Sequence, residues 1–347
     1  MTPGGTGDIE ISARGRAGRI TLNRPKALNA LTWDMCTAID AALNDWAARD
    51  DIDLLVIDAA GDKAFCAGGD IAQLYDTGRA GDYAYGQAFW RDEYRLNARL
   101  AGYSKPSVSF MQGFTMGGGV GIGCHVSHRI VGENSQIAMP ECGIGLLPDV
   151  GGSRLLAGAP GHLGAYIGIT GARMGPGDAI YAGFADAFVP RDDWPAVISA
   201  LEDSGSVDVI PQATPPGAPL AQAQTRIDAL FAPYDLAAIL AGLDASGDDL
   251  SKAAAKAIRR NSPLAMGAIL AILHRWSDGP PPAIETALAQ EYRFTWRAML
   301  HGDFLEGIRA QIIDKDRNPN WRDRIDALDP ARISAMLADL GPNELTF

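Results

Sequence analysis

The sequence predicts an α/β fold, in which strands and helices alternate through crossover connections. A nearly continuous apolar run over 53–59 has the length of a strand that is covered on both faces. Further strand-like runs follow at 104–114 and 129–132, after a helical pattern over 83–103. The runs at 53–59 and 104–114 each lead into a glycine-rich turn. This repeated order of strand, turn and helix favours a largely parallel sheet.

The first elements are predicted to be a hairpin and a capped helix. Apolar residues alternate over 9–13 and over 20–22, on either side of a turn at Gly15–Gly18. Thr32 then stands where a helix N-cap is expected, because its hydroxyl oxygen can accept a bond from a free backbone N–H. The apolar face of the helix that follows is formed by Met35, Ile39, Leu43 and Trp46.

Glu93 interrupts an apolar face of the second helix. On the helix over 83–103, positions 89, 93, 96 and 100 share a face and read Phe, Glu, Leu and Leu. A buried carboxylate without a partner is costly, so Glu93 should pair with another group. Both a structural ion pair and a functional role fit this pattern.

The chain is predicted to have three consecutive parts. Residues 8–203 read as the core, and 204–250 as a variable connection rich in Pro, Gly and Ser, with a helix. Residues 251–347 read as a helical C-terminal region packed on the core, with a break at 279–282.

Composition narrows the function classes. The 347 residues are 47% hydrophobic and 21% charged, and the formal net charge of −12 argues against a nucleic-acid partner. No apolar run is long enough to suggest a membrane span. The N-terminal segment resembles neither a signal peptide nor a transit peptide, so we expect a cytoplasmic, bacterial-type protein. Free, mostly buried thiols in a reducing compartment are expected at Cys36, Cys66, Cys124 and Cys142.

The two glycine turns predict a site for a negatively charged oxygen. Gly117–Gly119 follows a strand, and Ala67–Asp70 has the same setting. Glycine allows close approach of the backbone to a ligand, and the first N–H groups of a helix have no intrahelical partner. Two such N–H groups aimed at one oxygen would form an oxyanion hole. Merely tight turns are the alternative, whereas the spacing fits neither a dinucleotide fingerprint nor a phosphate loop.

Two carboxylates mark a second feature. Glu141 and Asp149 lie in a segment rich in glycine, proline and apolar residues. Apolar surroundings raise the pKa of a carboxyl group, which can then carry a proton near neutral pH. Either one alone could simply cap a turn. His125 and His128 lack an evident third metal ligand, and Ser153 lacks the nucleophile-elbow pattern, so neither a metal site nor a serine triad is favoured.

Four runs together resemble the crotonase (enoyl-CoA hydratase/isomerase) superfamily. They are ITLNRPKALNAL, AFCAGGDI, KPSVSFMQGFTMGGGVGIG and AMPECGIGLLPDVGG. Within it the chain looks most like the 3-hydroxyisobutyryl-CoA hydrolase branch. The further runs that carry this likeness are FWRDEYRLN, SPLAM, EYRFTWRAM and DFLEGIRAQIIDKDRNPNW.

The resemblance implies a spiral of repeated ββα units that binds an acyl-CoA. It implies an oxyanion hole made by the N–H groups of Gly69 and Gly118. It also places Glu141 and Asp149 as the catalytic acids and Glu93, together with Gly118, Glu141 and Asp149, at the substrate. The implied reaction is thioester hydrolysis, most simply of 3-hydroxyisobutyryl-CoA in valine catabolism.

One departure from the hydratases matters for this choice. They carry a catalytic glutamate where this chain has Gly121, and glycine where it has Asp149. Hydration of an enoyl-CoA, isomerisation, or hydrolysis of another short 3-hydroxyacyl-CoA remain the alternatives.

The resemblance also bears on ligands and assembly. We expect no metal and no organic cofactor, because the oxyanion hole polarises the thioester and coenzyme A is part of the substrate. Arg24, Lys26 and Ala67 are expected near the CoA group. A homo-oligomer is compatible with the superfamily.

Overall fold

A computed structural model describes residues 7–347 and divides them into two compact units. The first unit contains the described residues up to Gly69, with Asp92–Ala138 and Met174–Pro219. The second contains Asp70–Arg91, Met139–Arg173 and Leu220–Phe347. The units interleave along the chain, unlike the consecutive segments 8–203, 204–250 and 251–347, and that division into domains stays a prediction.

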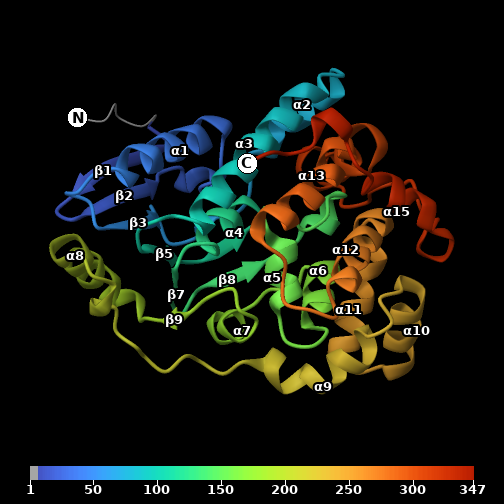
Figure 1. Ribbon diagram of the computed structural model, residues 1–347. Coiled ribbons are helices and arrows are strands. Elements are labelled where there is room, and N and C mark those ends of the chain that lie inside the picture. The colour runs from blue at the N-terminus through green and yellow to red at the C-terminus, as the bar shows by residue number, and fades with distance from the viewer. Residues whose placement is uncertain (1–6) are drawn as a thin grey trace. The chain divides into compact units, whose positions relative to one another are not determined.

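The first unit is built on two sheets (Figure 1). The larger has the order β1-β2-β3-β5-β7-β9, and the smaller the order β4-β6-β8. Among the strand pairs within residues 7–347, β1–β2 is antiparallel and the others are parallel. The strands are β1 Ile9–Arg14, β2 Ala17–Leu22, β3 Leu54–Ala59, β4 Ala64–Cys66, β5 Ser107–Met111, β6 Phe114–Met116, β7 His128–Val131, β8 Gln136–Ala138 and β9 Ala187–Phe188.

The expected repeat is visible in how consecutive strands are shared between the sheets. The pairs β3 and β4, β5 and β6, and β7 and β8 each give one strand to the larger sheet and one to the smaller. A helical segment follows each pair: α2 Ile71–Arg79, α4 Gly118–Gly123 and the 3₁₀ turn η2 Glu141–Ile144. The α/β class and the repeated ββα order predicted from the sequence are therefore confirmed.

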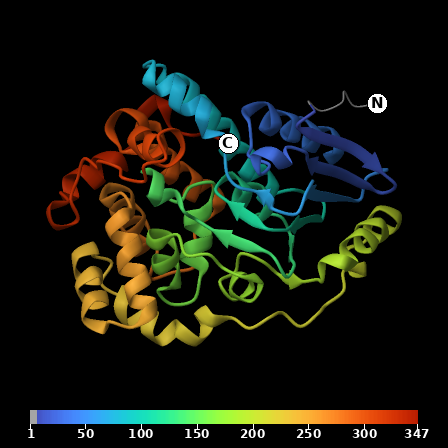
Figure 2. The same cartoon turned by 180° about the vertical axis from the view of Figure 1, so that it is seen from behind.

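Both faces of the larger sheet are covered by helices of the first unit. α8 (Trp194–Ser204) packs Trp194, Val197 and Leu201 against a face formed by alternate residues such as Leu54 and Val56. On the other face lies α1 (Trp33–Ala47), whose Trp46 ring occupies the space that a side chain at Gly18 would need. Figures 1 and 2 show α1 and α8 on opposite sides of these strands. This double cover explains the continuous apolar pattern of β3.

The hairpin and the capped helix form as predicted, with one difference. The turn is shorter than Gly15–Gly18, because Gly18 is already part of β2 and pairs with Ala13 of β1. Gly15 adopts a φ of +52°, which suits glycine. The Thr32 side chain accepts a hydrogen bond from the Met35 N–H at 3.2 Å, and the predicted apolar face of α1 is buried.

The remaining helices lie mostly in the second unit. α3 (Tyr83–Ala101) belongs to the second unit up to Arg91 and to the first unit from Asp92 onward, and α7 (Pro176–Tyr181) belongs to the first. The others are α5 Gly152–Gly158, α6 Leu163–Thr170, α9 Pro219–Phe231, α10 Leu236–Ser246, α11 Asp249–Arg260, α12 Pro263–Arg275, α13 Ile284–His301, α14 Phe304–Ile308 and α15 Pro330–Met336.

This arrangement bears on two further sequence predictions. The helical C-terminal region is confirmed, as is its break before α13, and the four cysteines are free and buried. Within residues 7–347, no helix has both the length and the apolar character that crossing a bilayer requires.

Thr32→Ala is expected to lower the free energy of unfolding by about 1 kcal/mol, because it removes the acceptor for the Met35 N–H. Urea denaturation would measure the change. Thr37→Ala is the matched control, since its exposed hydroxyl only donates to the Trp33 carbonyl of the same helix. Equal losses in both variants would show that the cap contributes nothing.

Candidate active site

Residues 24–31 are hydrogen-bonded to the first glycine turn, Ala67–Asp70. The Ala67 N–H donates to the Leu28 carbonyl at 3.1 Å, and the Leu31 N–H donates to the Gly68 carbonyl at 2.9 Å. Buried Asn29 holds the segment through bonds from its amide group to the Ala60 and Ala64 carbonyls. The sequence separates these segments by more than thirty residues, yet the structure makes them one surface.

Gly118, Gly69 and Glu93 meet at one point of the first unit. A Cβ placed on Gly118 would lie 2.7 Å from Oε1 of Glu93 and 3.5 Å from the backbone nitrogen of Gly69. Gly118 is the first residue of α4, so the helix itself offers no acceptor for its N–H. Gly117 precedes it with a φ of +49°. The structure therefore brings the two glycine turns close together, and the oxyanion hole expected there stays a prediction.

Glu93 lies in an apolar setting, as its position on α3 predicts. Its side chain is 3% exposed. The Cys36 and Cys66 thiols lie close enough to be affected by its charge. Burial raises the pKa of Cys66 to about 12, and the negative charge of Glu93 acts in the same direction. Both thiols therefore stay protonated, since burial and Glu93 also raise the pKa of Cys36.

Glu141 is placed by a fastened turn of the second unit. It opens the 3₁₀ turn η2 and is 5% exposed. The Ser262 N–H donates to the carbonyl of Cys142, the next residue, at 2.9 Å. The Ser262 hydroxyl donates in turn to Asp303 at 2.7 Å. The start of α12 and the residue before α14 thus hold the turn that presents Glu141.

Asp149 lies at the start of a turn with unusual backbone geometry. It is 4% exposed, and its carbonyl accepts a bond from the Gly152 N–H at 2.7 Å. Val150 has a φ of +54° and Gly151 a φ of +78°. A β-branched residue in the left-handed region is strained, and such strain persists only where surrounding contacts impose it.

Glu291 contacts this turn at Gly151 and Ser153. Its carboxyl group, fully buried on α13, accepts the Gly151 N–H at 2.7 Å and the Ser153 N–H at 3.0 Å. The Ser153 hydroxyl donates to the same carboxyl group. The pKa of Glu291 is raised to about 8, mainly by burial and in part by the charge of Asp149, while these hydrogen bonds act in the opposite direction.

The predicted site residues fall into two groups. Gly69, Gly118, Glu93 and Ala67 lie together in the first unit, whereas Glu141 and Asp149 belong to the second. The two basic residues expected near CoA differ in their contacts. The Arg24 side chain donates to the Ala30 carbonyl and pairs with Asp8, while the Lys26 side chain is exposed.

Sequence reasoning missed Glu291. A signal was available, because Glu291 interrupts an apolar face of α13 formed by Ala287, Phe294 and Ala298, as Glu93 does on α3. Ser153 was weighed only as a nucleophile, and the structure makes it a partner of Glu291.

Comparison with known proteins identifies the family. The enoyl-CoA hydratase/isomerase model matches residues 17–337. The chain belongs to this family. It is 36% identical to the mitochondrial 3-hydroxyisobutyryl-CoA hydrolase of Xenopus tropicalis, over 98% of this chain and 91% of that protein. It is 35% identical to the probable 3-hydroxyisobutyryl-CoA hydrolase 3 of Arabidopsis thaliana, over 88% and 84%. The resemblance drawn from the sequence is confirmed.

Solved structures share the fold over the whole chain. A protein of Rhodobacter sphaeroides described as an enoyl-CoA hydratase is 58% identical, with a TM-score of 0.95 and coverage of 98% of this chain and 100% of that one. A protein of Mycobacterium thermoresistibile described as a carnitinyl-CoA dehydratase is 39% identical, with a TM-score of 0.93 and coverage of 99% of both.

The relatives contradict the expected cytoplasmic location. Those of Xenopus tropicalis, Danio rerio and Rattus norvegicus are all named as mitochondrial. The expectation was wrong because it rested on the look of the N-terminal segment, and a folded core carries no information about the compartment in which it works. Residues 1–6 of that segment lie outside the described residues.

Glu291 is expected to make the protein less stable as the pH rises. Folding raises its pKa from the ordinary 4.5 to about 8, so between these values the folded protein holds a proton that the unfolded chain has released. Its contribution to the free energy of unfolding is complete below 4.5 and is lost as the pH passes 8. Urea denaturation across this range should show a steeper fall for the wild type than for Glu291→Gln. Equal slopes would contradict the raised pKa.

Proposed function

We propose that this protein hydrolyses the thioester of 3-hydroxyisobutyryl-CoA to 3-hydroxyisobutyrate and CoA, a step of valine catabolism. The proposal rests above all on the acid pattern. A buried Asp149 stands on a strained, fastened turn, and the position of the hydratase glutamate is Gly121. The names of the relatives in Xenopus tropicalis and Arabidopsis thaliana support the same reaction.

In the proposed mechanism, the thioester carbonyl oxygen binds between the N–H groups of Gly69 and Gly118. The short distance between the Gly69 nitrogen and the Cβ position of Gly118 supports this role. Backbone donors fixed in place stabilise a developing oxyanion without having to reorganise during the reaction. The mechanism needs no metal or organic cofactor, since these donors polarise the carbonyl.

Glu141 and Asp149 carry the chemistry in this proposal. Glu141 either attacks the carbonyl, which gives a mixed anhydride, or activates a water molecule for the attack. Asp149 orients the water or the substrate hydroxyl and passes a proton to the departing thiolate. In a single turnover in ¹⁸O-labelled water, label found in the Glu141 carboxyl group would support the anhydride route with water attacking the Glu141 carbonyl carbon, because general-base catalysis never places label there.

Glu93 and the segment at Arg24 complete the proposed substrate site. Glu93 bonds the substrate hydroxyl or positions a neighbouring group, consistent with its carboxyl oxygen 2.7 Å from the Gly118 Cβ position. Exposed Lys26, with Arg24 and the Ala67 backbone, serves the CoA group. A homo-oligomer stays an expectation from the family.

Enoyl-CoA hydration is the second candidate, because the 58% identical structure is described as an enoyl-CoA hydratase. Hydration normally uses two carboxylates on the family scaffold, and Gly121 removes one of them here. Offering crotonyl-CoA beside 3-hydroxyisobutyryl-CoA separates the candidates. Hydration of the first without thiol release from the second would reject the proposed hydrolase.

Glu141→Gln and Asp149→Asn are each expected to lower kcat on 3-hydroxyisobutyryl-CoA by about 10²- to 10⁴-fold, the usual contribution of a positioned acid or base. Affinity for CoA should change far less, because neither carboxyl group is expected to contact the nucleotide. Thiol release measures kcat, and calorimetric titration with CoA measures binding. Unchanged turnover in either variant would remove that residue from the mechanism.

Gly118→Ala is expected to lower kcat/KM by about 10²-fold or more, the scale of losing an oxyanion donor. The new methyl group would lie 2.7 Å from Glu93 and beside the Gly69 nitrogen, so it would displace one or both. Gly175→Ala is the matched control, since a Cβ there meets nothing within 4 Å. Equal kinetics in both variants would contradict the proposed position of the carbonyl oxygen.

A further inference from the structure

Glu291 holds the turn that follows Asp149 at two successive points. One carboxyl oxygen accepts the Gly151 N–H and the other accepts the Ser153 N–H and hydroxyl. The partners are about 140 residues away in sequence, and the carboxyl group has no exposed surface. Three hydrogen bonds from two points of the turn converge on this one buried side chain, so the contact is able to fix the backbone of the turn.

The turn needs such a fixture because of Val150. Its φ of +54° lies in the left-handed region, which is strained for a β-branched residue. Relaxation of Val150 would rotate the peptide that joins it to Asp149. The direction of the Asp149 side chain therefore depends on whatever keeps Gly151 and Ser153 in place.

We infer that Glu291 is a positioning residue that aims Asp149 at the substrate by fastening the Asp149–Ser153 turn to α13. This inference rests on the catalytic role of Asp149 in the proposed function and assigns the work of orientation to a different residue. Glu291 acts through the backbone and not on the substrate.

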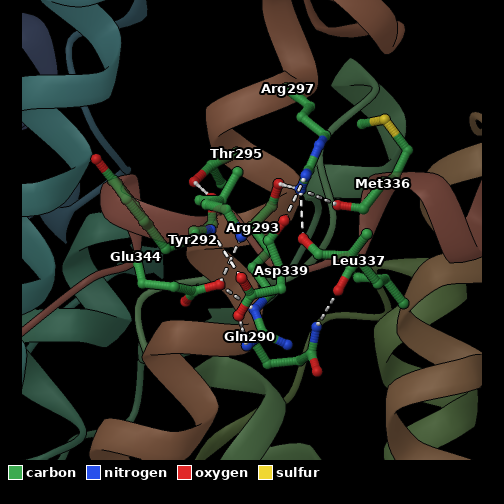
Figure 3. Close-up of polar contacts among 12 residues, drawn as sticks. Gln290, Tyr292, Arg293, Thr295, Arg297, Met336, Leu337, Asp339 and Glu344 are labelled. Carbon is green, nitrogen blue, oxygen red and sulfur yellow. Dashed lines mark hydrogen bonds and ion pairs between the residues drawn. The ribbon is translucent and has the colours of Figure 1, made fainter.

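α13 is itself anchored, which makes it a suitable frame. Figure 3 shows Gln290, Arg293 and Arg297 directed at the last part of the chain. Arg293 pairs with Glu344 at 2.7 Å, and Arg297 donates to the Ala338 carbonyl at 2.7 Å. Gln290 donates to the Leu337 carbonyl at 3.3 Å. The C-terminal residues thus fix the helix from which Glu291 reaches the turn.

Electrostatics is consistent with this role. Asp149 is close enough that its charge helps raise the pKa of Glu291, while burial is the largest cause. With a pKa of about 8, Glu291 is mostly protonated at neutral pH and then adds no second negative charge beside Asp149. A neutral carboxyl group still has a lone pair on each oxygen, so it can accept from both backbone N–H groups.

Glutamine cannot reproduce this contact. Both carboxyl oxygens of Glu291 accept a backbone N–H. In either orientation of a glutamine, its NH₂ group would face one of those N–H groups, and two donors repel. Glu291→Gln therefore keeps the size of the side chain and loses one attachment of the turn.

The test compares kcat, KM and thermal stability for Glu291→Gln and Thr295→Val with those of the wild-type protein. Thr295 is the matched control because it is buried one turn further along α13 and its hydroxyl bonds only to the Tyr292 carbonyl of that helix. Glu291→Gln should lower kcat about 10- to 100-fold, the scale for displacing a reacting group by about 1 Å. KM should change less than about threefold, and Thr295→Val should keep wild-type kcat.

Two further variants keep the test informative if Glu291→Gln folds poorly. Ser153→Ala removes only the hydroxyl bond and should lower kcat about 3- to 10-fold, the scale of one hydrogen bond. Glu291→Asp retains both acceptor oxygens and should recover part of the kcat lost in Glu291→Gln. The inference would be overturned if Ser153→Ala kept the wild-type kcat and Glu291→Asp had a lower kcat than Glu291→Gln.

A double-variant cycle separates positioning from general damage. If Glu291 acts only through Asp149, then Asp149→Asn with Glu291→Gln should be no slower than Asp149→Asn alone. Additive losses would overturn the inference. If Asp149→Asn itself keeps its turnover, the catalytic role of Asp149 in the proposed function fails whatever Glu291 does. A nearly inactive Asp149→Asn beside a fully active Glu291→Gln overturns only the positioning role.

Discussion

Backbone packed directly against backbone is the constraint on which the first unit depends. A side chain at Gly119 would collide with the Cys66 carbonyl, and one at Gly118 would meet Glu93 and the Gly69 nitrogen. Side chains at these positions would push α4 away from β4, so glycine is required for the helix to begin where it does. The same closeness places the Gly69 backbone nitrogen beside Gly118, as the proposed oxyanion hole requires.

The second unit solves a different problem, since its acids are side chains on short turns. Turns of this kind are held poorly by their own hydrogen bonds, and both are tied to helices from the C-terminal region. Ser262 and Asp303 fasten the turn of Glu141, and Glu291 fastens the turn of Asp149. The C-terminal helices therefore do more than cover apolar surface, because each acid turn depends on a buried carboxylate from outside its own segment.

The sequence predicted the elements that depend on local pattern. The β1–β2 hairpin, the Thr32 cap and the buried face of α3 all follow from periodicity and capping within about twenty residues. The two glycine turns were proposed as one anion site from their position after strands, and the assignment to Gly69 and Gly118 came from resemblance to a family, because spacing alone does not bring two turns together. The fastening of Asp149 was not predicted, since it joins residues about 140 positions apart. Only the polar interruption of the apolar face at Glu291 hinted at it, and that pattern does not name a partner.

The strained backbone at Val150 has a consequence for moving this chemistry to a related scaffold. If Glu291 has the inferred positioning role, an aspartate written into a hydratase at this position would need a matching attachment of its turn before it could be aimed at the substrate. A transfer of this site to a related protein would therefore have to include the Asp149–Ser153 turn, Glu291 of α13 and the C-terminal residues that contact this helix. A change of reaction on this scaffold requires coordinated exchanges at sites far apart in the gene.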